Sequence, residues 1–96
     1  MELQTEKTPS VEIFEDETVD TGLESRVVLF NDDWHTFEEV ITQLIKATKC
    51  SFEEARDKTF EVHNNGKSVV FNGSLNNCLK VSTILEEIAL HTQVET

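Results

Sequence analysis

The chain has 96 residues, a net charge of −11 and 38% hydrophobic residues, which suits one small folded domain. Such an acidic chain argues against nucleic acid as a partner, because phosphates require a basic surface. No apolar run is long enough to cross a membrane or resembles a secretory signal. We therefore expect neutral or cationic partners, with no nucleic-acid and no membrane association.

The two cysteines, Cys50 and Cys78, lie far apart and form no CxxC pair. Isolated cysteines of this kind are typical of free thiols in a reducing compartment. We therefore expect a cytoplasmic protein.

The first quarter of the chain is an acidic segment, with eight Asp or Glu residues against one lysine in residues 1–24. Its apolar residues are scattered without a helical or strand period, so they form no packed face. We predict a disordered extension over residues 1–24 and a folded domain over residues 25–96. Taken by its residues alone, the extension suits a solvated leader that aids solubility.

The folded domain opens with β-branched and aromatic residues over positions 26–31, which predict a buried strand. Apolar residues then recur at helical spacing between Phe37 and Ile45. Thr36 and Glu39 precede that stripe as a capping box, which predicts where the first helix begins.

A second capping box, Ser51 with Glu54, predicts a second helix from Phe52. The sequence Asn-Asn-Gly ending at Gly66 predicts the end of this helix, because glycine adopts the left-handed conformation at little cost. Residues 67–72 then predict a second strand.

The last third of the chain predicts a third helix and a short strand. Ser74 is the expected cap of the helix, and residues 89–95 are the expected strand. The apolar face of the helix is expected to carry Leu75, Cys78, Leu79 and Leu85. The order β-α-α-β-α-β predicts an α+β fold: a three-stranded, mainly antiparallel sheet with three helices packed on one face.

Polar side chains crowd the connection between the first strand and the first helix, in the sequence NDDWH over residues 31–35. Acidic residues at a helix start can satisfy free N–H groups and suit the helix dipole. The capping box of Thr36 and Glu39 already fills that role. Asp32 and Asp33 therefore remain available for another task.

Metal binding and catalysis are two alternatives for this cluster. Asp32, Asp33 and His35 would form a mixed metal site with a distant histidine, but no HxxxH or paired-cysteine spacing supports it. Catalysis gains no support from a recognisable motif, because the chain has no nucleophile elbow and no glycine-rich phosphate loop. We expect no metal, no cofactor and no enzymatic activity.

A cation site is the third alternative. An ammonium group has three donors and needs three acceptors. The Asn31 carboxamide and the Asp32 carboxylate supply two of them. A neutral His63 ring supplies the third if the second helix lies against this loop, although a histidine near a helix C-terminus also suits the helix dipole.

Two stretches, VVLFNDDWHTFEEV at residues 27–40 and EARDKTFEVHNNGKSVV at residues 54–70, resemble the ClpS family of adaptors for the Clp AAA+ protease. That family carries Asn-Asp-Asp after its first strand and Val-His ahead of Gly-Lys before its second. The resemblance extends over residues 25–72 and, more loosely, over residues 73–96. It implies a monomeric adaptor that binds proteins with a large hydrophobic N-terminal residue (an N-degron) and delivers them to a Clp unfoldase.

The resemblance also implies the roles of individual residues. The α-amino group of the substrate would be held by Asn31, Asp32 and His63. The pocket for its first side chain would be formed by Phe37, Thr59 and Val62, with Asp33 and His35 as additional contacts. Lys80 resembles a residue that touches the N-terminal domain of the unfoldase.

The sequence departs from the family pattern at several positions. Phe37 and Thr59 replace two methionines of the pocket, which predicts an altered preference among N-degrons. We interpret His35 as an exposed loop histidine. The usual Gly-His-Pro-Leu approach to the last strand is missing, so we assign no pocket residue to this end and interpret His91 as a strand or surface residue.

These departures leave a second interpretation of function. A diverged ClpS-like paralogue would have altered specificity, or would act mainly as a modulator or inhibitor of Clp substrate choice.

Overall fold

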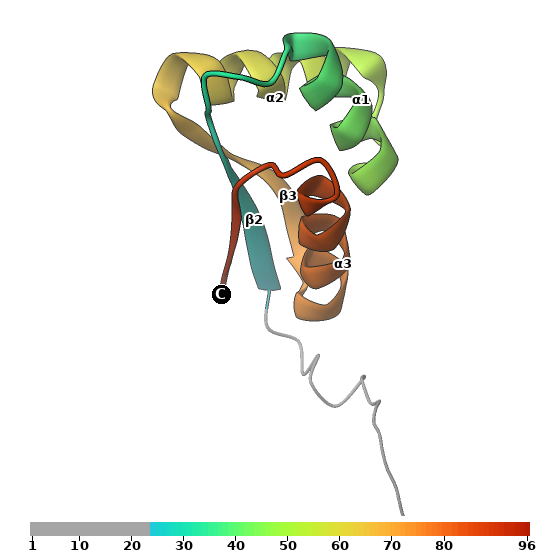
Figure 1. The fold of residues 1–96 in the computed structure, drawn as a ribbon. Helices are drawn as coiled ribbons and strands as arrows, with labels where there is room; N and C mark the ends of the chain where they lie inside the picture. The colour runs from blue at the N-terminus through green and yellow to red at the C-terminus, as the bar shows by residue number, and fades with distance from the viewer. Residues whose placement is uncertain (1–23) are drawn as a thin grey trace, which may run out of the picture.

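The computed structural model describes residues 24–96 (Figure 1). The acidic extension predicted over residues 1–24 lies outside the described residues, apart from Glu24. The elements follow in the order β2 (Glu24–Phe30), α1 (Phe37–Thr48), α2 (Phe52–Asn65), β3 (Lys67–Ser74), α3 (Leu75–Glu86) and β4 (Thr92–Glu95). Over this part of the chain, no helix is long and apolar enough to span a membrane.

The sheet has β2 at its centre, with β3 and β4 paired antiparallel on its two sides. This confirms the predicted α+β fold, its three-stranded sheet and its element order. The register between β2 and β3 shifts between Val27 and Val28, as it does at a β-bulge. Val27, Val28 and Leu29 are consequently all buried, although side chains in a regular strand alternate between its faces.

Both predicted capping boxes are formed. In α1, the backbone N–H of Thr36 donates to Glu39 Oε1 at 2.8 Å and that of Glu39 donates to Thr36 Oγ1 at 3.1 Å. Ser51 and Glu54 make the same pair of bonds at the start of α2. Each box satisfies two backbone donors that the helix itself leaves free.

The three helices enclose one core with the sheet. α3 contacts all three strands, α2 contacts β3, and α1 packs mainly against α2 and α3; Figure 1 shows α1 and α2 together beyond one end of the sheet. The largest fully buried apolar side chains are Leu29, Leu44, Leu85 and Val27. The expectation that Leu79 faces the core is wrong: it is 48% exposed, and Val81 and Ser82 are buried instead.

The C-terminal strand is shorter than the predicted span of residues 89–95. A turn follows α3, in which the backbone N–H of Ala89 donates to the Glu86 carbonyl at 2.9 Å and Ala89 has a φ of 66°. This left-handed conformation is uncommon for alanine, so its residue type gives no sign of the turn. β4 begins only at Thr92.

Candidate functional site

Three segments that are distant in sequence meet around one cavity of about 220 Å³: the β2–α1 loop, the C-terminal half of α2 and the α3–β4 connection. Its lining includes all eight residues that the sequence analysis assigned to the amine site, the pocket or the additional contacts. These are Asn31, Asp32, Asp33, His35, Phe37, Thr59, Val62 and His63. Lys80 is not among the lining residues and borders a separate apolar hollow on α3.

Two backbone hydrogen bonds bring these segments together at the end of β2. The N–H of Asn31 donates to the Gly66 carbonyl at 2.9 Å, and the N–H of Phe30 donates to the His91 carbonyl at 3.0 Å. Gly66 is the C-cap of α2, with a φ of 87°. The first bond therefore holds the last turn of α2, with His63, beside the Asn31 loop.

Aromatic rings and buried side chains form the apolar part of the cavity. The Phe37 ring meets the rings of Phe60 and His63 edge to face, with centroids 4.9 and 5.1 Å apart. Val62 and Thr59 are buried in α2. The Thr59 hydroxyl donates to the Ala55 carbonyl at 2.7 Å, so its polarity is satisfied within the helix and does not require a polar ligand group.

Four lining residues were missed by the sequence analysis: Leu29, Phe30, Val40 and Leu90. Leu29 and Phe30 are the last residues of the strand that leads directly to Asn31. Their position next to the polar cluster could have indicated that they line the cavity. Leu90 reaches the cavity because the carbonyl of its neighbour His91 accepts from the Phe30 N–H, directly beyond the paired residues of β2 and β4. The C-terminal end therefore does contribute a residue to the cavity lining, contrary to the expectation from the sequence.

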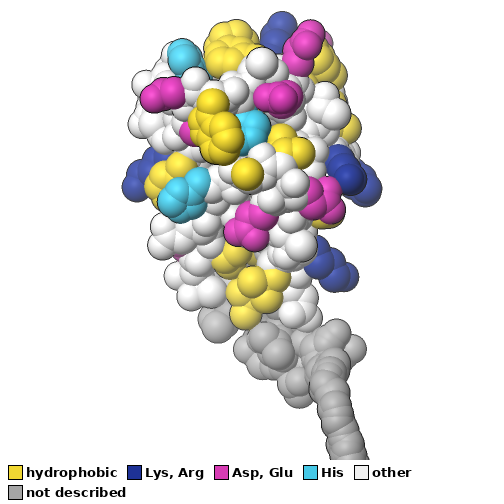
Figure 2. Space-filling model, in the orientation of Figure 1, with side chains coloured by type: hydrophobic (Ala, Val, Ile, Leu, Met, Phe, Trp, Pro, Cys, Tyr) yellow, Lys and Arg dark blue, Asp and Glu magenta, His cyan; other side chains and the backbone are white. Residues whose placement is uncertain are grey.

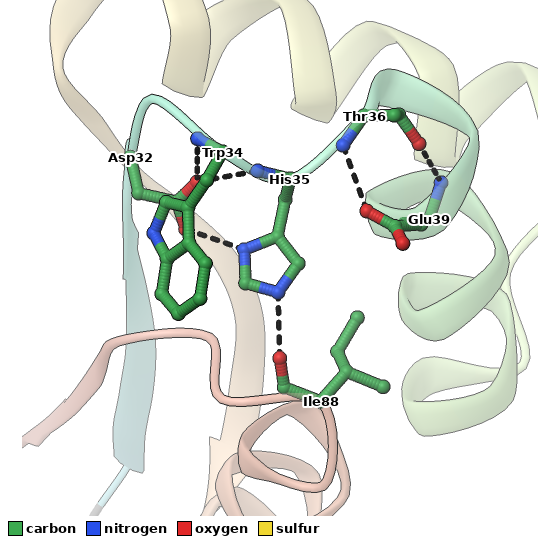
Figure 3. A network of polar contacts seen from close by, with 6 residues as sticks. All are labelled: Asp32, Trp34, His35, Thr36, Glu39 and Ile88. Atoms are coloured by element: carbon green, nitrogen blue, oxygen red, sulfur yellow. Dashed lines mark hydrogen bonds and ion pairs between the residues drawn. The ribbon is translucent and has the colours of Figure 1, made fainter.

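The Asp32 carboxylate is the centre of a hydrogen-bond network inside the β2–α1 loop (Figure 3). Its Oδ1 accepts from the backbone N–H groups of Trp34 and His35, at 3.0 and 2.9 Å. Its Oδ2 accepts from His35 Nδ1 at 2.6 Å. An ionised carboxylate offers about four acceptor positions, so one remains for a ligand.

The interpretation of His35 as an exposed histidine is wrong. Its side chain is only 9% exposed, and its second ring nitrogen, Nε2, lies 2.6 Å from the Ile88 carbonyl oxygen. Figure 3 shows the ring between the Asp32 carboxylate and the α3–β4 turn. The partner is 53 residues away in sequence, so no local pattern could have revealed it.

The two charged groups of this pair shift each other's pKa. Burial opposes ionisation of Asp32, but the hydrogen bonds from the His35 and Trp34 backbone and from the His35 ring outweigh it and lower the pKa of the carboxyl group. Burial likewise opposes protonation of His35. The bonds to Asp32 and to the Ile88 carbonyl outweigh that effect and raise the pKa of the ring.

Other polar groups at the cavity stay accessible to a ligand. Asn31, Asp33 and His63 are exposed while also lining the cavity. Figure 2 shows acidic, histidine and hydrophobic side chains close together on the upper part of the molecule. In the described residues, no three His, Cys, Asp or Glu side chains are grouped to hold a metal ion, so the metal alternative gains no support. The arrangement suits a ligand with a cationic group beside an apolar one.

Comparison with known sequences gives a family match over most of the chain. Residues 23–94 match the family model described as ATP-dependent Clp protease adaptor protein ClpS. The chain is also 32% identical over 65 residues to the E3 ubiquitin-protein ligase UBR1 of Drosophila melanogaster. That match covers 68% of this chain but spans only 4% of the length of the ligase.

Comparison with solved structures gives a similar fold. The structure of Agrobacterium tumefaciens ClpS2 bound to L-phenylalaninamide matches with a TM-score of 0.70 and 20% sequence identity. The match covers 75% of this chain and 94% of that one. At this identity the likeness establishes the fold.

Proposed function

The chain belongs to the ClpS family of Clp protease adaptors, and we propose that it binds proteins through a free N-terminal α-amino group followed by a large hydrophobic side chain. The observation that carries this proposal is the shared cavity of Asn31, Asp32 and His63, with apolar walls beside them. The ligand named in the Agrobacterium structure, L-phenylalaninamide, has an amino group beside an aromatic side chain, a combination that complements the polar and apolar parts of this cavity.

In this proposal the ammonium group donates to three acceptors. The Asn31 side-chain oxygen and a neutral His63 ring nitrogen provide two, and the remaining acceptor position of Asp32 provides the third. Asp33 adds a second negative charge at the same cavity. Binding involves no covalent step, and the role is that of an adaptor rather than an enzyme.

The first side chain of the substrate enters between Phe37, Val62 and Leu90. Burying a Leu or Phe side chain contributes about 1.5–3 kcal/mol. The Phe37 ring lines this cavity, and a pair of aromatic rings contributes about 0.5–1.5 kcal/mol beyond the burial of its area. We therefore propose that aromatic first residues bind more tightly than Leu.

Acetylation of the substrate tests the amine site. Acetylation removes the positive charge and donors, and it leaves acceptors unpaired at about 1–3 kcal/mol each. Fluorescence anisotropy with labelled peptides beginning in Phe or acetyl-Phe should show at least about tenfold weaker binding of the acetylated peptide. Equal binding of the two peptides would end the proposal.

Delivery to a Clp unfoldase is the second half of the proposed role. On α3, Lys80 borders an apolar hollow with Leu79, Thr83 and Ile84, and Leu79 is exposed there. We place the contact with the unfoldase N-terminal domain on this surface. Cys50 and Cys78 form no disulfide, which suits a cytoplasmic setting. Lys80→Glu should abolish pull-down of that domain while leaving the peptide affinity unchanged; retained pull-down would exclude this surface.

A further inference from the structure

His35 connects two parts of the proposed site that are far apart in sequence. Its Nδ1 lies 2.6 Å from Asp32 Oδ2, and its Nε2 lies 2.6 Å from the Ile88 carbonyl oxygen. Ile88 belongs to the turn after α3, and Leu90, two residues further, lines the cavity. The ring therefore spans from a polar group of the site to the segment that carries one of its apolar walls (Figure 3).

The chemistry of the two partners fixes the protonation of the ring. A carboxylate and a carbonyl oxygen both accept hydrogen bonds and cannot donate them. A neutral imidazole carries one N–H, so one ring nitrogen would place its lone pair against an oxygen. Only the imidazolium, with N–H groups on both nitrogens, donates to both partners.

We infer that His35, as an imidazolium, is a positioning residue of the N-degron site: it holds the Asp32 carboxylate and the Ile88–Leu90 segment in one geometry. This inference rests on the proposed function, since it assigns His35 a task at that same site. His35 itself acts through Asp32 and Leu90 and is not required to touch the substrate.

The surroundings favour the charged ring. In its own loop, Asp32 pairs with the ring and Asp33 shares the cavity; on α1, Glu39 attracts the positive charge. On α2, His63 faces the same cavity. The raised pKa of His35 agrees with this arrangement.

Two other titratable side chains near the α3–β4 turn make no contact with the His35 ring. Glu87 pairs with Lys46 at 2.8 Å, and the His91 ring packs against Phe30 with centroids 4.7 Å apart. Neither belongs to the cavity lining. His91 therefore provides a matched control: a second histidine near the site that makes no bridge to Asp32.

The test compares peptide affinity across pH for the wild type, His35→Gln and His91→Gln in the full chain. Labelled peptides beginning in Phe and acetyl-Phe are titrated by anisotropy between about pH 6 and pH 9. Dividing the affinity of the wild type by that of each variant at the same pH cancels the titration of the peptide's own amine.

We expect the wild type to bind the Phe peptide about tenfold more tightly than His35→Gln near pH 6, where the ring is charged. The ratio should fall below about threefold near pH 9, because the neutral ring loses one of its two bonds. His91→Gln should match the wild type throughout. A ratio for His35→Gln that equals one, or that stays constant with pH, overturns the inference.

Failure of the proposed function gives a different result: the wild type itself would bind Phe and acetyl-Phe peptides equally. If His35→Gln does not fold, the ¹⁵N spectrum of the wild-type ring decides. Two protonated ring nitrogens near pH 6, which lose a proton together with the loss of affinity, support the inference. A neutral ring near pH 6 overturns it.

Discussion

The backbone N–H of Asn31 donates a hydrogen bond to the carbonyl oxygen of Gly66, with 2.9 Å between nitrogen and oxygen. This bond joins the loop after β2 to the C-cap of α2, so the end of one helix determines where His63 lies relative to Asn31. The site therefore depends on a turn that makes no contact with the ligand in the proposed mode of binding.

Substitution of Gly66 should impair both stability and binding. Gly66 has a φ of 87°, and a Cβ added there would meet no other part of the protein within 4 Å, so the penalty for alanine is conformational and not steric. Gly66→Ala should lower the free energy of unfolding by about 1 kcal/mol and weaken binding of a Phe peptide. Gly66→Asn is the control, because asparagine tolerates this conformation better; a larger loss with Asn than with Ala would contradict the explanation.

His63→Ala should weaken binding without comparable loss of stability, since His63 is exposed and is not part of the buried core. Loss of one hydrogen bond to a charged group corresponds to about 1.5–3 kcal/mol, or roughly tenfold to more than a hundredfold in affinity. The acetylated peptide, which has no ammonium group, should show little change. Equal losses for both peptides would indicate that His63 contributes to the apolar wall instead.

We expect the large, stiff Phe37 ring to disfavour β-branched first residues such as Ile, and Phe37→Ala should weaken this discrimination. The Phe37 ring lines the cavity between Phe60 and His63, and its removal would widen the space near the Cβ atom of the first residue. Affinity for a Phe peptide should fall, while the preference for Phe over Ile narrows several-fold. Anisotropy with both peptides measures this; an unchanged ratio would show that another residue excludes Ile.

The two capping boxes allow stability and binding to be separated. Thr36→Ala and Ser51→Ala each remove a helix cap and should each lower the free energy of unfolding by about 1 kcal/mol. Only Thr36 lies between His35 and Phe37, two residues of the cavity lining. Urea unfolding should therefore show similar losses of stability for the two variants. Peptide titration should show reduced affinity only for Thr36→Ala. Reduced affinity in Ser51→Ala would mean that general destabilisation accounts for the effect.

The pair of Asp32 and His35 should give stability a defined pH dependence. The pKa of Asp32 is lowered from 3.8, so its contribution is present above that value and is lost as pH falls through the folded-state pKa. The pKa of His35 is raised from 6.5, so its contribution is complete below that value and is lost as pH rises through the folded-state pKa.

The stability difference between the wild type and His35→Gln should therefore be largest near about pH 5 and smaller at both extremes. Urea unfolding of both proteins at a series of pH values measures it. A difference that grows steadily above about pH 7 would have the wrong sign for a charged ring and would refute the assignment.

Local signals made much of the fold predictable. The capping boxes at Thr36 and Ser51 and the glycine at position 66 act within a few residues, so α1 and α2 begin, and α2 ends, where the sequence indicates. The group of polar residues after β2 was also recognisable in the sequence. The turn that ends α3 was not recognisable, because Ala89 adopts a left-handed conformation that its residue type does not suggest.

The missed parts of the site depend on contacts between distant segments. Leu90 lines the cavity because the Phe30 N–H pairs with the His91 carbonyl, and His35 is buried against the Ile88 carbonyl. Neither pairing leaves a periodic pattern in the sequence. Leu79 is one of the apolar residues expected on the third helix with Leu75, Cys78 and Leu85, yet it is exposed next to Lys80.

The main proposal is that this cavity binds a free α-amino group together with its hydrophobic side chain. It is best tested by an NMR titration of the ¹⁵N-labelled protein with L-phenylalaninamide and, separately, with its N-acetyl form. We expect saturable shift changes at Asn31, His63 and Leu90 with the free amine, and none at the same concentrations with the acetylated compound. Equal changes with both compounds, or changes located away from these residues, would refute the proposal.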